Sequence, residues 1–196
     1  AHYGAEKTTA IDLIYIDNNS SVTIDTCSVK SIIIKNNSSV TIKDSFVINN
    51  NYQINTSTIS IEKSSAILLR NYIENIRDDG NGTNALYCYS NELVELSNNI
   101  IVVRNLSTDS GIQAVGIKAH AFLNSIVVNN NLIFVQNKSN GLNSALYVYD
   151  YQNQHYIRVL NNIFYRLRPS TDKGWGIWNL HTTLDPHIIR NNFFLN

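Results

Sequence analysis

The stretch SIVVNNNLIFVQN, residues 125–137, places three asparagines between two short runs of Val, Ile, Leu and Phe. Asparagine forms strands poorly, so it divides what would otherwise be one long strand. The same arrangement occurs in ELSNNIIVV (95–103), RVLNNIFYR (158–166) and IIRNNFFLN (188–196). A motif that recurs this often indicates an internal structural repeat rather than an isolated turn.

Seven segments align on this bend. The second residue of the bend is then Cys27, Ser45, Asn71, Asn99, Asn131, Asn162 and Asn192, with spacings of 18, 26, 28, 32, 31 and 30 residues. A further short strand precedes each pair, for example LYCY (86–89), VGIK (115–118) and LYVY (146–149). Three short strands per repeat predict the coils of a parallel β-helix, stacked about 4.8 Å apart.

The segments VGIKAHAFLNSIVVNNNLIF (115–134) and GIWNLHTTLDPHIIRNNFF (176–194) resemble the repeat of right-handed parallel β-helix proteins with the pectate-lyase-like fold. The resemblance implies an all-β, single-stranded right-handed parallel β-helix (solenoid) of about seven coils. We expect one domain over residues 1–196, which is a piece of a longer chain or a subunit of an assembly. A left-handed β-helix is the alternative for the 18-residue spacing, but its hexapeptide signature is absent.

The resemblance also assigns a structural role to the asparagines. In this family one residue of the bend is left-handed, a conformation that Asn tolerates well. The side chains of successive coils are expected to stack inside the bend as an Asn ladder from Asn71 to Asn192. Cys27 and Ser45 occupy the same position in the first two coils and are expected to break the ladder there.

The bulk composition excludes some classes of function. Lys and Arg together number 15, as do Asp and Glu, so the formal net charge is zero. Nucleic-acid binders normally carry a basic excess, so we expect no nucleic-acid partner. No apolar run reaches the roughly 18 residues of a membrane-spanning helix, so we expect no membrane span. Sequons at 18–20, 36–38, 55–57 and 81–83 favour an extracellular or cell-surface location, although chance matches are expected among 30 asparagines.

The outward positions of the first strand of each coil are rich in aromatic residues. Side chains alternate along a strand, so one outward column is predicted to hold Tyr15, Ile33, Ser60, Tyr87, Gly116, Tyr147 and Gly176. The next column would hold Asp17, Lys35, Glu62, Tyr89, Lys118, Tyr149 and Trp178, with His120 and Tyr151 at its edge. The candidate carbohydrate-binding residues are therefore Tyr87, Tyr89, Lys118, His120, Tyr147, Tyr149, Tyr151 and Trp178. A flat row of exposed rings suits a sugar chain, but long loops or a protein contact are an equal alternative.

Candidate metal ligands and catalytic groups are few. Asp78, Asp79 and Asn81 in RDDGNGTN (77–84) offer oxygen ligands to Ca²⁺, although a Gly-Asn-Gly sequence is also ordinary turn chemistry. No other cofactor is expected. We find no outward Asp pair that spans neighbouring coils and no Lys, Arg and Asp trio of the kind used by polysaccharide lyases and hydrolases, so no catalytic residue is assigned.

The third strand of each coil is apolar on both sides. Its outward residues are predicted to be Phe46, Tyr72, Ile100, Leu132, Ile163 and Phe193, and its inward residues Ile101, Ile133, Phe164 and Phe194. A strand apolar on both sides is usually covered on both sides, by loops or by a partner. Three hypotheses remain: a non-enzymatic surface or adhesin-type protein that binds polysaccharide, a structural subunit that self-associates through its terminal coil or third sheet, and a lyase or glycoside hydrolase fragment.

Overall fold

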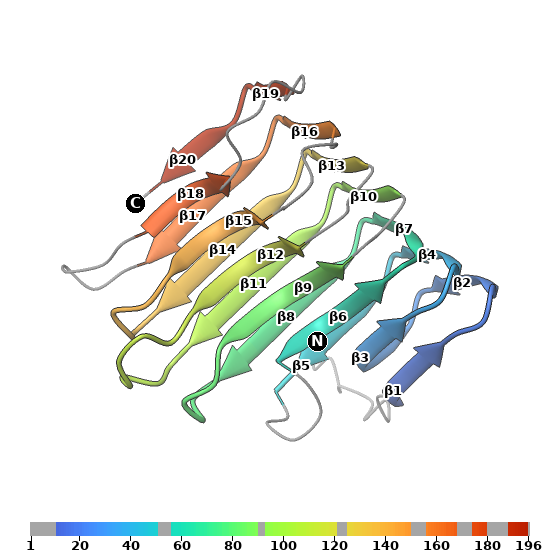
Figure 1. Cartoon of the computed structure of the whole chain (residues 1–196), viewed down its shortest axis with the longest axis horizontal. Helices are drawn as coiled ribbons and strands as arrows, with labels where there is room; N and C mark the ends of the chain where they lie inside the picture. Colours follow the sequence, from blue (N-terminus) through green and yellow to red (C-terminus); the bar gives the residue numbers. More distant parts are fainter. Residues whose placement is uncertain are drawn as a thin grey trace, which may run out of the picture.

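The computed structural model describes residues 11–50, 56–89, 93–120, 125–149, 156–167, 174–179 and 188–195. These ranges contain twenty strands, which pair in parallel and wind as a solenoid (Figure 1). None of the described residues forms a helix suited to crossing a membrane. The predicted all-β parallel β-helix is therefore confirmed.

Each regular coil contributes one strand to each of three faces. The strands of the first face are β1 (Ile11–Ile16), β3 (Ser28–Ile34), β6 (Ser57–Glu62), β9 (Thr83–Tyr89), β12 (Ala114–His120), β15 (Asn143–Tyr149) and β18 (Gly174–Asn179). The second face holds β2 (Ser21–Asp25), β4 (Ser39–Lys43), β7 (Ser65–Leu69), β10 (Leu93–Ser97), β13 (Ser125–Asn129), β16 (Tyr156–Leu160) and β19 (Ile188–Arg190). The third holds β5 (Phe46–Asn49), β8 (Tyr72–Arg77), β11 (Ile100–Asn105), β14 (Leu132–Asn137), β17 (Ile163–Leu167) and β20 (Phe193–Leu195).

The number of regular coils is about four rather than the predicted seven. Three separate strands form each of the coils β6–β8, β9–β11, β12–β14 and β15–β17. Towards the N-terminus, β3 pairs with both β5 and β6, so the first and third faces merge into one thirteen-stranded sheet. The spacing of only 18 residues between Cys27 and Ser45 leaves no room there for a loop between two strands.

The core consists of aliphatic columns from all three faces. The inward residues predicted for the first and second strands are buried, for example Leu86, Ile117, Leu96 and Val128. In the third strand Ile101, Ile133 and Phe164 are buried, but Phe194 is 47% exposed and packs on one side against Phe164 (centroids 5.0 Å apart). Phe194 points inward as predicted, because its ring packs on Phe164 and lies against Gly176, but the side chain is not fully buried.

The two residues of each Asn bend have different roles. The first residue has φ between 51° and 58° in every bend; the seven residues are Thr26, Asp44, Arg70, Asn98, Asn130, Asn161 and Asn191. The second residue is buried in the five bends from Ser45 to Asn162 and half-buried in the two end bends, and its side chain forms the ladder. Asn99 Oδ1 accepts from both Asn71 N (2.9 Å) and Asn71 Nδ2 (3.0 Å), and Asn131 Oδ1 accepts in the same way from Asn99.

The ladder also ties each bend to the coil before it. Asn131 Nδ2 donates to the carbonyl of Leu96 (3.0 Å), and Asn162 Nδ2 donates to that of Val128 (2.9 Å). Ser45 does not end the column, because its Oγ accepts from Cys27 N (3.1 Å) and its N–H donates to Asn71 Oδ1 (3.0 Å). The column of amide side chains ends at Asn71, as predicted, because Ser45 carries a hydroxyl group. The hydrogen bonds between coils nevertheless continue through Ser45 to Cys27.

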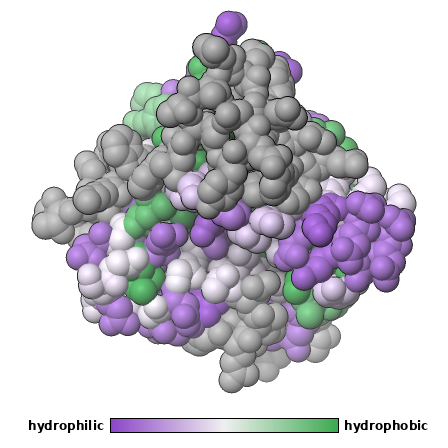
Figure 2. Space-filling model, in the orientation of Figure 1, coloured by the Kyte–Doolittle hydropathy of each residue, from purple (hydrophilic) through white to green (hydrophobic). Residues whose placement is uncertain are grey.

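A second polar stack holds the bends that follow the first strand in the N-terminal coils. Asn18, Asn19, Asn36 and Asn37 all have positive φ, so each NN pair takes two left-handed residues in succession. A serine ends each bend and donates back across it; Ser38 Oγ, for example, donates to the carbonyl of residue 35 (2.8 Å). Hydrophilic residues gather on the side where β1, β2 and β4 lie (Figure 2).

Close packing explains two glycines of the first face. A Cβ atom on Gly116 would lie 2.5 Å from the carbonyl oxygen of Ala145 and 2.7 Å from Ile133 Cγ2. A Cβ atom on Gly176 would lie 2.3 Å from the ring of Phe194. Neither glycine therefore stands in the outward aromatic column where the sequence pattern placed it.

Candidate ligand-binding face

The strand register brings six of the eight candidate carbohydrate-binding residues together on the first face. Ile117 pairs with Leu86 and Leu146, which places Lys118 between Tyr87 and Tyr147 and places His120 between Tyr89 and Tyr149. We call these six residues the aromatic face; they are Tyr87, Tyr89, Lys118, His120, Tyr147 and Tyr149. All six side chains are half-buried.

The predicted columns were wrong by two residues in this part of the first face. Lys118, not Gly116, is the neighbour of Tyr87, and His120 occupies the position assigned to Lys118. The backbone of Trp178 pairs with Tyr147, so it continues the same column as Tyr87. The side chain of Trp178 and the whole of Tyr151 lie outside the described part of the structure.

The rings of the aromatic face stack on one another along the solenoid axis. His120 lies 5.7 Å from Tyr89 and 5.1 Å from Tyr149 between ring centroids, and both pairs are within 20° of parallel. Along each strand the rings are also nearly parallel, with Tyr87 and Tyr89 6.4 Å apart and Tyr147 and Tyr149 6.2 Å apart. These distances are typical of offset stacking, which is worth about 1 kcal/mol per pair beyond burial.

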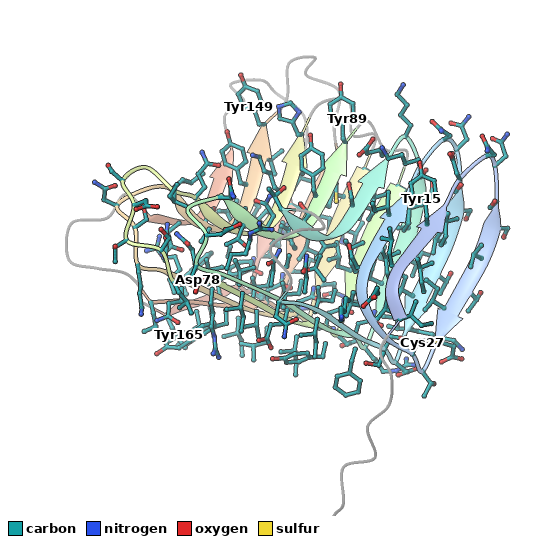
Figure 3. All side chains as sticks on the ribbon, turned by 90° about the horizontal axis from the view of Figure 1, so that it is seen from below. Tyr15, Cys27, Asp78, Tyr89, Tyr149 and Tyr165 are labelled. Carbon is teal, nitrogen blue, oxygen red and sulfur yellow. The ribbon has the colours of Figure 1, made fainter. Side chains whose placement is uncertain are left out.

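Stacking determines what the aromatic face presents to a ligand. The His120 ring stacks between those of Tyr89 and Tyr149, so one face of each tyrosine ring is turned towards the imidazole rather than outward. The hydroxyl groups of Tyr89 and Tyr149 point away from the sheet, on the side opposite to Tyr165 (Figure 3). The expected flat row of ring faces is thus replaced by a ridge of ring edges with polar tips.

Lys118 gives the aromatic face its cationic group. Its Nζ lies 5.9 Å from the ring centroid of Tyr147, within reach of a cation–π contact. Burial lowers the pKa of the Lys118 ammonium and raises the pKa of the Tyr87 and Tyr147 hydroxyl groups. The half-buried side chains give up part of their contact with water, which strengthens polar contacts made there.

The outward positions of β9, β12 and β15 carry no carboxylate. The acidic residue next in line is Glu62, which pairs with Tyr89 in register and forms an ion pair with Lys35 (3.2 Å). General acid–base hydrolysis of a glycoside normally uses two carboxyl groups. The aromatic face offers phenol, imidazole and ammonium groups instead, which suit hydrogen bonding to hydroxyl groups.

The predicted calcium ligands adopt a different arrangement. Both oxygens of Asp79 accept hydrogen bonds from the buried guanidinium of Arg77 (3.1 Å and 2.5 Å), and the Asn81 side chain donates to Asp79 Oδ2 (2.9 Å). The Arg77 hydrogen bonds hold the pKa of Asp79 well below its ordinary range. Asp78 is exposed, and the described residues contain no cluster of three or more His, Cys, Asp or Glu side chains suited to a metal ion. The geometry therefore favours an ion-pair role for Asp79.

The outward residues of the third face are exposed, as the sequence pattern suggested. Phe46, Ile100, Leu132, Ile163 and Phe193 are between 38% and 61% exposed, and Tyr72 is half-buried. An open hollow of about 360 Å³ lies beside the N-terminal end of this row; it is lined by Asp44, Ser45, Phe46, Arg70, Asn71, Tyr72, Asn98 and Ile100. Among the residues described, loops do not cover the row.

Sequence reasoning missed the polar residues buried inside the third strand. Asn105 Nδ2 donates to Asn137 Oδ1 (2.7 Å), and each of these Asn Oδ1 atoms accepts from the backbone N–H two residues later, at Ser107 and Ser139 (both 3.1 Å). The signal was present in the sequence as a second Asn six residues after the ladder Asn, at Asn105 and Asn137. These bonds shape the loops at one edge of the solenoid.

No family model, no curated protein and no solved structure matched the chain in the three comparisons made. The parallel β-solenoid is established by the strand topology alone.

Proposed function

We propose that the protein binds polysaccharide through the aromatic face without chemical turnover, as a surface or adhesin-type module outside the cell. The observation that carries the proposal is the convergence of four Tyr residues, His120 and Lys118 on three adjacent strands. We also propose that the fold is related to the pectate-lyase-like β-helices. The resemblance of residues 115–134 and 176–194 to their repeat supports this relation.

The chemistry of the aromatic face fits sugar hydroxyl groups. Phenol and imidazole groups donate and accept hydrogen bonds, while the ring edges beside them offer apolar contact to C–H groups. Ser60 is the neighbour of Tyr87 in the preceding coil, and its small side chain cannot cover an aromatic ring. One sugar unit is therefore expected to stack there, with the rest of the chain lying across the hydroxyl tips.

Binding to polysaccharide can be tested with one variant on each of two faces of the solenoid. Tyr149→Ala removes an end of the ring stack, and Ile67→Ala removes an exposed apolar side chain from the second face. We expect the wild-type protein and Ile67→Ala to bind insoluble cellulose, chitin or pectin in pull-down assays. Tyr149→Ala should bind about tenfold more weakly, which corresponds to the loss of one good ring contact.

Two outcomes would contradict this function. If both variants bind the insoluble polysaccharide equally well, the aromatic face is not the binding site. Release of unsaturated or reducing sugars by the wild-type protein, measured by absorbance and by a reducing-end assay, would make it an enzyme.

A further inference from the structure

The third face presents apolar residues in register along its whole described length. Phe46 pairs in register with Tyr72, which in turn pairs with Ile100. Leu132, Ile163 and Phe193 continue the same row through the next three coils. A second row runs beside it at the positions two residues further on; it holds Ile48, Glu74, Val102, Phe134, Tyr165 and Leu195.

The exposed apolar area of this face is large for a surface that faces only water. Seven of its large apolar residues are between 38% and 61% exposed: Phe46, Ile100, Leu132, Ile163, Leu167, Phe193 and Leu195. At roughly 200 Å² for a fully exposed large side chain, they expose about 600 Å². That area is at the upper end for patches on monomeric proteins. Two such faces bury about 1,200 Å² together, which reaches the range of specific protein interfaces.

We propose that the third face is the interface between two copies of this chain, related by a two-fold axis that lies in the face. The axis runs parallel to the strands, midway between β11 and β14. A rotation of 180° about this axis leaves each residue at the same height along the strand direction and reverses the order of the coils. Ile100 of one copy then lies opposite Leu132 of the other, and Phe46 lies opposite Phe193.

The polar residues of the face fit this symmetry. Glu74, which accepts a hydrogen bond from the Tyr72 hydroxyl, comes opposite the phenol of Tyr165 in the second copy. Arg104, whose guanidinium lies 5.6 Å from the Phe134 ring centroid, comes opposite Gln136. No like charges meet, and each charged side chain gains a polar neighbour. The zero formal net charge adds no long-range repulsion between copies.

A matched pair of variants tests the interface. Ile100→Lys places a charge at the centre of the third face, and Ile67→Lys places one at a similarly exposed Ile (39% against 44%) on the second face. We expect the wild-type protein to form a reversible dimer with a micromolar Kd in sedimentation experiments. Ile100→Lys should raise that Kd at least about tenfold because it enters the dimer twice, whereas Ile67→Lys should leave the Kd unchanged.

A second measurement tests the symmetry. Sheets packed face to face lie about 10 Å apart, so a short bismaleimide can bridge them. Equal amounts of Phe46→Cys and Phe193→Cys proteins, both carrying Cys27→Ser, should be bridged more efficiently when mixed than either protein alone. In this arrangement residues 46 and 193 of two copies lie opposite each other, whereas identical residues lie five strand spacings apart, which is about 24 Å. A wild-type monomer at all micromolar concentrations would overturn the proposal, as would equal weakening by the two Lys variants. A dimer without preferential bridging between residues 46 and 193 would overturn the proposed arrangement.

Discussion

At the scale of single residues, the two asparagines of the repeated pair solve different problems. The first takes the left-handed backbone that the bend requires, and residues as different as Thr26 and Arg70 also occupy this position. The second carries the ladder, where the side chain must both donate and accept hydrogen bonds. Asn131 accepts from Asn99 and donates to two backbone carbonyls, at Leu96 and at residue 129. An amide side chain offers two N–H donors and an acceptor oxygen together, whereas a hydroxyl group offers only one donor.

The two roles predict different costs of substitution. Asn131→Leu leaves buried donors of Asn99 without their acceptor and should lower the free energy of unfolding by about 1–3 kcal/mol. Asn130→Gly keeps the positive φ of the first position, so the free energy of unfolding should change by less than about 0.5 kcal/mol. Urea denaturation of both variants checks this difference. Equal midpoints for Asn131→Leu and the wild type would remove the ladder argument.

At the scale of strands, the alternation of the sequence predicted which side chains point inward but not their register between coils. A slip of two residues keeps every inward residue inward, so the pattern VGIKAH fits two registers equally well. The structure selects the register in which Gly116 packs against Ile133 and Lys118 joins the Tyr87 column. The loops and the close contact at Gly116 determine the register between the coils. The alternation of residues within one strand gives no information about either of them.

The same limit explains the other differences from the expected fold. The first and third faces merge at β3 because the 18-residue coil there has no loop between its strands. This difference depends on the spacing of the repeats and not on the type of residue. The ring stacking of Tyr89, His120 and Tyr149 follows from strand spacing once the register is known. The alternation along each strand predicted that aromatic residues gather on one face, but it gave no orientation for the rings.

The loop after β8 carries an ion pair whose effect depends on pH. Arg77 lowers the pKa of Asp79, so the ionised carboxylate stabilises the fold above its unfolded-state pKa of about 3.9, and this stabilisation is lost as pH falls towards the folded-state pKa. Asp79→Asn should cost about 1 kcal/mol at pH 7, because the partly exposed pair is screened. The difference between the urea midpoints of the two proteins should be smaller at pH 3 than at pH 7 and should vanish only below the folded-state pKa. Asp78→Asn is the control, and a constant difference at both pH values would contradict the ion-pair role.

At the scale of the whole molecule, the solenoid separates two surfaces of different chemistry. The aromatic face lies on one side, and the third face lies on the opposite side (Figure 3). The proposed dimer therefore leaves both aromatic faces open. Two copies joined through their third faces would present two polysaccharide-binding surfaces pointing in opposite directions, which allows the pair to cross-link sugar chains.

Hydrogen exchange of individual backbone amides tests the ladder-built solenoid most directly. The backbone N–H groups of Asn71, Asn99 and Asn131 each donate to the side chain of the next coil's ladder Asn (2.8–2.9 Å). If this ladder holds the coils together, these amides exchange as slowly as those of core strand residues such as Leu96, because they open only with the core. Exchange as fast as that of the exposed Asn81 amide would contradict the account.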